Sequence, residues 1–177
     1  MTAYRRNLVA GGTFFFTVNL ADRRSRLLVE RIAALRESFR AARLCHPFIN
    51  DAIVILPDHL HAIWTLPPDD SDYATRWNLI KGSFSRAVPP GDPISPSRSA
   101  RRERGIWQRR YWEHTIRDHD DFVCHIEYIH FNPVKHGYVM DVAAWPHSSF
   151  HAFVRRGAYP ASWGAVTADS AGSFGER

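Results

Sequence analysis

The sequence predicts one α+β domain in which strands and helices follow the order β-α-β-β-α-β before a final helix. Three observations predict it: short runs rich in aromatic and β-branched residues, segments whose apolar residues recur at helical spacing, and a turn dipeptide between the two middle strands. With 177 residues the chain can bury one core of ordinary size but is short for two.

The first half of the chain contains a strand, a helix and a hairpin. Residues 13–20 (TFFFTVNL) follow two glycines and are typical of a buried strand. Residues 25–44 carry apolar side chains at i, i+4, i+7 and i+11 with charged residues between them, which predicts an amphipathic helix. Residues 48–56 and 60–66 are strand-like, and the turn dipeptide Pro57-Asp58 between them predicts an antiparallel hairpin.

A second amphipathic helix and a linker-like segment follow the hairpin. Tyr73 and Phe84 mark the ends of an apolar pattern with the same spacing as the first helix, and Asp70 or Ser71 could cap its start. Residues 88–105 are rich in Pro, Ser and Arg and contain few large apolar groups. This composition predicts a mobile basic loop on the surface.

One more strand and one more helix complete the domain. Residues 106–116 (IWQRRYWEHTI) resemble a fourth strand, and residues 118–131 a third helix that ends at Asn132-Pro133. The whole order is the ferredoxin-like plan, a sandwich of one antiparallel sheet with helices packed mainly on one face. The domain is expected to span residues 1–163, and the Gly-, Ser- and Ala-rich residues 164–177 are expected to form a disordered tail.

The charge balance favours a polyanionic partner. Lys and Arg outnumber Asp and Glu by 23 to 18, giving a net charge of +5 that comes mostly from arginine, the side chain suited to phosphate contacts. Two cysteines are too few for a disulfide framework or a cysteine-rich zinc module. No apolar leader follows the N-terminus and no apolar stretch is long enough to cross a membrane, so a cytoplasmic protein is expected.

Two histidines on a predicted strand could bind a metal ion. His59 and His61 flank Leu60, and because strand side chains alternate, both imidazoles project from the same face. The simpler alternative is a pair of polar residues on a solvated face. Since the neighbouring residues keep the strand apolar, a covered face would leave both imidazoles in need of a partner, which a metal ion would supply.

The third predicted helix carries a possible nucleophile. Tyr128 lies about a third of a turn away from the apolar stripe of this helix. Asn132 comes four residues later and therefore lies on the same face as Tyr128. A tyrosine nucleophile and an amide oxygen able to complete a metal site could then act together, the alternative being an ordinary packing tyrosine.

A metal ion and a tyrosine together suit phosphodiester chemistry. A divalent cation on a phosphate oxygen polarises the phosphorus, while the phenolate forms a covalent phosphotyrosine that conserves the bond energy for rejoining. Two imidazoles, one amide and water positions suit Mg²⁺ or, better with nitrogen ligands, Mn²⁺. Zinc with a third histidine stays open as an alternative, with candidates His114, His125 and His130.

A basic and aromatic segment predicts a surface that binds nucleic acid. Arginines on phosphates with aromatic rings for base stacking is the usual design of single-strand binding sites, and a solvated arginine-rich loop is the alternative. The predicted DNA-binding residues in and after the loop are Arg98, Arg101, Arg102, Arg104, Trp107, Arg109 and Arg110. Further cationic candidates elsewhere in the chain are Arg5, Arg6, Arg76, Lys81 and Lys135.

Six segments of the chain carry motifs that point to one family. They are GGTFFFTVN (11–19), LPDHLH (56–61), LIK (79–81), GIWQRR (105–110), WEH (112–114) and YIHFNPVK (128–135). Across residues 4–163 the chain thereby resembles the REP-associated tyrosine transposases, a branch of the single-tyrosine HUH transposases, in which HUH denotes His-hydrophobe-His.

The resemblance implies a site and a substrate. It implies a divalent metal held by His59, His61 and Asn132, and Tyr128 as the nucleophile that becomes a 5′-phosphotyrosine and leaves a 3′-hydroxyl. Insertion-sequence members commonly have Gln at the last ligand position. Asn132 is one methylene shorter, and this difference affects which metal the site is expected to prefer. The implied substrate is single-stranded DNA with REP hairpins. The implied assembly is a monomer, whereas related insertion-sequence enzymes form homodimers that exchange the tyrosine helix.

Three hypotheses for the function follow. The leading one is a metal-dependent endonuclease and strand transferase that acts on single-stranded DNA beside REP hairpins. A rival is a domesticated module that recognises such hairpins without cutting them. A third is a sheet-based RNA binder, because RRM domains share the βαββαβ order, although the His-x-His strand argues against it.

Overall fold

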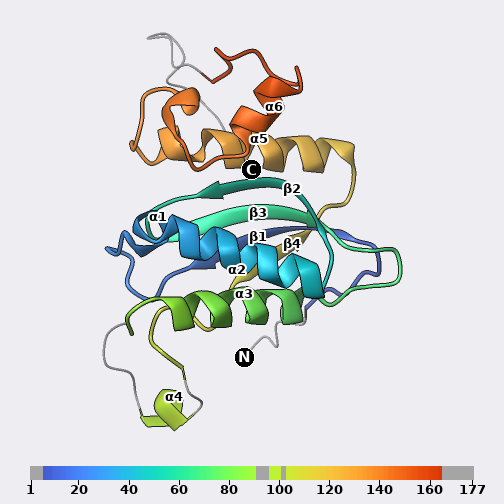
Figure 1. Cartoon of the computed structure of the whole chain (residues 1–177). Coiled ribbons are helices and arrows are strands. Elements are labelled where there is room, and N and C mark those ends of the chain that lie inside the picture. The colour runs from blue at the N-terminus through green and yellow to red at the C-terminus, as the bar shows by residue number, and fades with distance from the viewer. Residues whose placement is uncertain (1–5, 91–95, 101–102, 165–177) are drawn as a thin grey trace, which may run out of the picture.

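The computed structural model describes residues 6–90, 96–100 and 103–164 of the chain. Its centre is an antiparallel four-stranded sheet in the order β2-β3-β1-β4 (Figure 1). One helical segment connects β1 to β2 and another connects β3 to β4, which is the ferredoxin-like α+β plan that the sequence predicts. The strands are β1 (Thr13–Asn19), β2 (Ile49–Ile55), β3 (His59–Thr65) and β4 (Trp112–Thr115).

Both faces of the sheet are apolar because the central strand β1 places large side chains on each of them. Phe14 and Phe16 belong to the core on one face, and Phe15 belongs to the core on the other. On the first face Trp64 of β3 stacks on Trp77, with ring centroids 4.1 Å apart. The strand that carries the histidine pair is therefore covered on both sides.

Three helices cover the first face of the sheet: α1 (Leu27–Glu30), α2 (Ile32–Cys45) and α3 (Tyr73–Ala87). The single helix predicted for residues 25–44 is divided, because Arg31 has φ −113° and ψ 33°, outside the helical region. Asp72 caps α3, since its carboxylate accepts a hydrogen bond from the Thr75 backbone N–H at 2.9 Å. The cap therefore lies later than Asp70 or Ser71, the two residues that the sequence suggests.

A second helical layer covers the opposite face, so the expectation that the helices pack mainly on one face is wrong. Figure 1 shows α5 and α6 on one side of the sheet and α2 and α3 on the other. The cause is the second apolar face, where Phe15 and Ile63 pack with Ile126 and Ile129 of α5. The elements of this layer are α5 (His119–Lys135), η1 (Val142–Ala144) and α6 (Phe150–Arg155).

Strand β4 is shorter and helix α5 is longer than the sequence predicts. Of residues 106–116, only Trp112–Thr115 pairs with β1 as a strand, while Trp107 makes an isolated bridge to Leu20. Helix α5 continues through Asn132-Pro133 to Lys135. A proline withholds one backbone donor, and here the burial of both residues against the second face keeps the helix continuous.

Part of the loop predicted at residues 88–105 is a short helix, α4 (Pro96–Ala100). Residues 91–95 and 101–102 lie outside the described part of the chain, as do residues 165–177 of the predicted tail, so loop mobility and tail disorder stay predictions. Within the described ranges, no helix is both long and apolar enough to cross a lipid bilayer.

Candidate active site

The histidine pair lies on the face of the sheet that α5 covers. In the register between β1 and β3, His61 is opposite Thr17 and His59 is opposite Asn19, so the two imidazoles share one face as strand alternation predicts. Their ring centroids are 5.1 Å apart. Both side chains are buried, which removes the alternative of two polar residues on a solvated strand face.

Each imidazole is oriented by a hydrogen bond from its Nδ1 atom. His61 Nδ1 is hydrogen-bonded to the Thr17 hydroxyl at 2.8 Å, and His59 Nδ1 lies 2.8 Å from Asp58 Oδ1. Arg23 holds the other oxygen of Asp58 in an ion pair of 2.8 Å. In each ring these contacts leave Nε2 as the remaining nitrogen, an arrangement typical of histidines that bind metals.

Burial keeps both imidazoles neutral at pH 7. It lowers the pKa of His59 below its ordinary value, and the neighbouring Asp58 opposes this only partly. It lowers the pKa of His61 further, and the positive charge that His59 and His136 would carry adds to the effect. Because a metal binds only the neutral form of histidine, both side chains are already in the state that a ligand needs.

Helix α5 brings the predicted nucleophile onto this pair. The Tyr128 ring makes an edge-on contact with His61, with centroids 5.2 Å apart, and a second edge-on contact with Phe15 at 5.9 Å. Lys135 places its ammonium 5.2 Å from the centre of the Tyr128 ring. The phenol thus lies between the buried imidazole and a cation at the surface.

Asn132 is the buried amide of this site. It lies one helical turn after Tyr128 and one turn before His136, and these two residues contact His61 and His59 respectively. Asn132 therefore faces the histidine pair. The side chain is fully buried, and neither its oxygen nor its nitrogen has a hydrogen-bond partner in the described part of the chain.

These residues fit a divalent cation. The Nε2 atom of His61 is also buried and without a hydrogen-bond partner among the described residues. Leaving an imidazole nitrogen and an amide unpaired in an apolar interior costs about 1–3 kcal/mol for each group, which a bound cation would offset. The imidazole and amide donor set is the one that the sequence predicts from His59, His61 and Asn132.

His136 is a further member of the site that the sequence reasoning missed. Its ring centroid lies 5.2 Å from that of His59, and burial lowers the pKa of His136 below its ordinary value, with Asp58 opposing the shift. The signal was the spacing of Tyr128, Asn132 and His136 at i, i+4 and i+8. That spacing places the three side chains on one face only if the helix continues through Pro133, as it does.

None of the three alternative zinc ligands completes this site. His130 is fully buried on another face of α5, where its Nε2 lies 2.9 Å from the Ser149 hydroxyl and burial lowers its pKa to about 4. His114 and His125 stack on each other with ring centroids 4.8 Å apart. They are separated from His61 by the ring of Phe15, which stacks on His61 at 5.4 Å and lies 4.7 Å from His125.

The predicted basic surface lies beside α3. Lys81 donates a hydrogen bond to the Gln108 carbonyl at 2.7 Å and lies over the rings of Trp107 and Tyr111. Burial lowers the pKa of Lys81 to about 8, with Glu103 opposing the effect. A pocket of about 400 Å³ opens here between α3 and residues 103–109, and the cationic residues that line it are Lys81, Arg86, Arg104 and Arg109.

Two predicted DNA contacts have other surroundings than expected. Trp107 is 6% exposed and packs on Phe84 with ring centroids 5.4 Å apart. Its ring lines the pocket as a buried side chain and is not open to base stacking. Arg76 is 1% exposed and pairs with Asp70 at 2.7 Å, which makes it a core residue.

The other cationic candidates divide into described and undescribed groups. Arg104 and Arg110 are exposed, and the exposed Arg109 pairs with Glu103 at 2.8 Å. Arg6 lies 4.8 Å above the ring of Tyr111, the ring that Lys81 also contacts. Arg98 belongs to α4, but its side chain lies outside the described part, as do Arg5, Arg101 and Arg102.

A ferredoxin-like sheet with paired buried histidines under a tyrosine-bearing helix is the arrangement expected of a single-tyrosine transposase. Known proteins with similar sequences carry the name of tyrosine transposases. The chain is 46% identical over 173 residues to the REP-associated tyrosine transposase of Escherichia coli K12, and the match covers 97% of both chains. It is 45% identical over 165 residues to a Haemophilus influenzae protein assigned to the same kind of transposase, covering 93% of this chain and 94% of the relative.

A solved structure extends the similarity to three dimensions. It shows a REP-associated tyrosine transposase bound to a REP hairpin, with a TM-score of 0.81 and 44% sequence identity, covering 100% of this chain and 98% of that one. No family model matches the sequence. On this identity and coverage the chain belongs to the family of REP-associated tyrosine transposases.

Proposed function

We propose that this transposase cleaves and rejoins single-stranded DNA beside REP-type hairpins, with Tyr128 forming a 5′-phosphotyrosine intermediate. The observation that carries the proposal is the contact between the Tyr128 ring and His61, a buried imidazole with one nitrogen unpaired in the described part of the chain. Family membership supports the enzyme class, and the related structure bound to a REP hairpin supports the substrate.

His59, His61 and Asn132 would hold a divalent cation, Mg²⁺ or Mn²⁺. When bound, such an ion polarises a phosphate oxygen and neutralises the charge that builds up on the phosphate during attack. The two imidazoles offer nitrogen lone pairs at pH 7 because burial keeps their pKa values low. Asn132 offers an amide oxygen. Because this side chain is fully buried, water does not reach the amide.

The covalent chemistry consists of two in-line displacements at phosphorus. In the first, the phenolate oxygen of Tyr128 attacks the phosphorus, the bond to the 3′ oxygen breaks, and that oxygen leaves with a proton as a 3′-hydroxyl. Lys135 places a positive charge beside the ring where the phenolate forms. In the second, a 3′-hydroxyl attacks the phosphotyrosine, releases Tyr128 and restores a continuous strand.

The residues of the proposed site come together within one chain. Tyr128 on α5 contacts His61 of the sheet that the same chain forms, and His136 contacts His59 in the same way. No helix has to be exchanged between two copies for these contacts to form. We therefore infer that a monomer carries the activity.

The direct test is an oligonucleotide assay with the purified full chain. A labelled single-stranded REP hairpin with flanking sequence is incubated with Mg²⁺, Mn²⁺ or a chelator, and the products are resolved on a denaturing gel. We expect a protease-sensitive protein–DNA adduct and a shortened strand with a free 3′-hydroxyl, both only with metal. Hairpin binding without any adduct in Mn²⁺ would instead identify a binding module that recognises hairpins without cutting them.

The basic pocket beside α3 and the exposed Arg110, which follows its lining residue Arg109 in the sequence, are expected to supply phosphate contacts. Arg104→Gln combined with Arg110→Gln should weaken binding and reduce the slope of log K against log salt concentration by about 1 to 2, because each lost phosphate contact releases about 0.7 to 0.9 fewer counterions. Fluorescence anisotropy at several salt concentrations measures the slope. Arg155→Gln with Arg156→Gln, two exposed residues at the end of α6, is the matched control. An unchanged slope in the first variant would place the DNA footprint elsewhere.

A further inference from the structure

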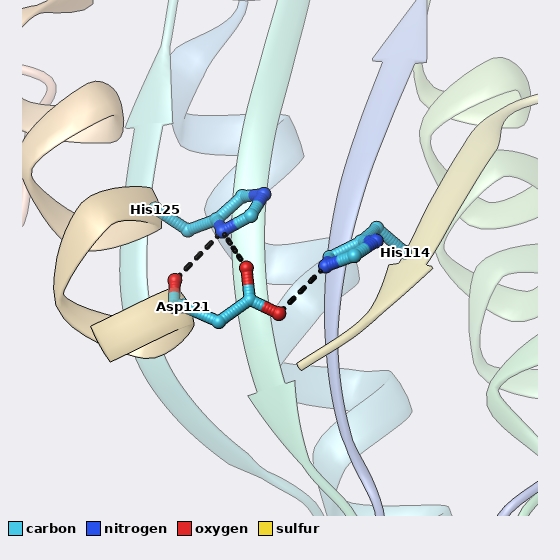
Figure 2. Close-up of side chains that lie close together, drawn as sticks. All are labelled: His114, Asp121 and His125. Carbon is cyan, nitrogen blue, oxygen red and sulfur yellow. Dashed lines mark hydrogen bonds and ion pairs between the residues drawn. The ribbon is translucent and has the colours of Figure 1, made fainter. Parts of the chain in front are cut away.

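A second cluster of metal-binding side chains lies between β4 and the first turns of α5. Figure 2 shows His114 on the strand and Asp121 and His125 on the helix, with the carboxylate between the two imidazoles. Asp121 Oδ2 lies 2.9 Å from His114 Nε2, and Asp121 Oδ1 lies 3.1 Å from His125 Nδ1. In the described part of the chain, His114, Asp121 and His125 form the group of His, Cys, Asp or Glu side chains that lie close enough together to share one metal ion.

The donor set and its spacing fit a transition-metal ion. Each of the three residues offers one ligand atom, and these atoms all lie within 4.8 Å of one another. Asp121 and His125 are four residues apart on α5, the spacing by which helices present two ligands to one ion. Two nitrogen donors and one carboxylate oxygen form a set that zinc favours, whereas Mg²⁺ and Ca²⁺ favour oxygen alone.

The cluster is also open enough for an ion to enter. The side chains of His114 and His125 are 25% and 21% exposed, while that of Asp121 is 7% exposed. Burial alone would raise the pKa of Asp121, but hydrogen bonds from His114 and Arg117 outweigh it and hold that pKa below its ordinary value. The carboxylate is therefore ionised at the centre of the cluster, where the exposed Arg117 also pairs with its Oδ2 atom at 3.1 Å.

We propose that His114, Asp121 and His125 form a zinc site that is separate from the candidate active site. Zinc would bind the nitrogen of each imidazole that now faces Asp121, and each neutral ring would carry its single proton on its other nitrogen. The ring of Phe15 separates the two sites, because it stacks on His61 at 5.4 Å and contacts His125 at 4.7 Å. The two histidine clusters therefore do not share a ligand.

The zinc ion would hold the start of α5 against the edge strand. Asp121 lies seven residues, or two helical turns, before Tyr128 on the same side of the helix. Fixing Asp121 and His125 to His114 thereby fixes the rotation of α5 over the sheet. The ion would act as a clip that positions the tyrosine without touching DNA.

The test uses the full chain with the candidate active site removed by His59→Ala and His61→Ala. Isothermal titration with Zn²⁺ should show one equivalent bound in the micromolar range or tighter. Thermal unfolding should occur about 5–10 °C higher with zinc at a hundred times Kd. Adding His114→Gln and His125→Gln to the same chain should abolish both effects. His119→Gln, which changes an exposed histidine in the first turn of α5, is the matched control.

X-ray absorption at the zinc edge keeps the proposal testable even if the quadruple variant does not fold. The chain with one equivalent of Zn²⁺ and intact His114 and His125 should show two imidazole nitrogens and one or two oxygens around the ion. Failure of that chain to bind zinc would overturn the proposal. Binding that survives the loss of both His114 and His125 would also overturn it. Neither outcome depends on whether Tyr128 cleaves DNA.

Discussion

Tyr128→Phe should abolish the covalent adduct with a REP hairpin while leaving hairpin binding nearly unchanged. The substitution removes one hydroxyl and keeps the ring that packs against His61 and Phe15, so the fold should be preserved. Without the phenolate no phosphorus–oxygen bond to the protein can form, and strand cleavage should fall by at least about a thousandfold. Denaturing gels measure the adduct, and anisotropy measures the binding.

The matched control for this loss is Tyr159→Phe. Tyr159 is a partly buried tyrosine that packs on Phe153 in the layer of α6, away from the histidine pair. Its loss should leave the adduct intact. An adduct that persists at normal rate in Tyr128→Phe would transfer the role of nucleophile to another residue and refute the mechanism.

Asn132→Leu should lower activity and raise stability in the same protein. The side chain is fully buried with both polar atoms unpaired in the described part of the chain, so an apolar side chain of similar size should stabilise the metal-free protein by about 1 kcal/mol. The same change removes a proposed metal ligand, which should weaken Mn²⁺ binding by about a hundredfold or more. Urea unfolding with chelator measures the first effect, and calorimetric titration the second.

Two further variants separate the ligand role of Asn132 from mere packing. Asn132→Gln keeps the amide and should retain metal-dependent cleavage, with a shift in metal preference. Asn50→Leu changes a half-buried asparagine on β2, away from the histidine pair, and should leave activity unchanged. If Asn132→Leu loses stability and keeps full Mn²⁺ affinity, the amide has a structural role and the ligand set must be redrawn.

The parts of the site that could be predicted from sequence are those set by local geometry. Strand alternation places His59 and His61 on one face, and helical spacing places Tyr128 and Asn132 together, whatever the rest of the chain does. The antiparallel hairpin could be predicted from the turn dipeptide between its strands. The order of strands and helices along the chain could be predicted from the spacing of apolar residues.

The parts that could not be predicted depend on tertiary packing. Pro133 stays inside α5 because the helix is buried along that turn, and only that continuation brings His136 to His59. Trp107 lies among arginines in the sequence, which suggested an exposed ring. In the structure this ring packs on Phe84 of α3 and belongs to the core. Residues 106–116 all have strand-like character, but β1 pairs with only four of them.

The position of Phe15 has a consequence for how this site can change over evolutionary time. Its ring contacts His61, His125, Tyr128 and Trp112, which come from three different elements. A new side chain at position 15 would alter the surroundings of both histidine clusters at once. Few substitutions of Phe15 are therefore expected to be tolerated. Among related chains that keep His61 and Tyr128, positions 15, 112 and 125 are expected to vary together, with few tolerated combinations.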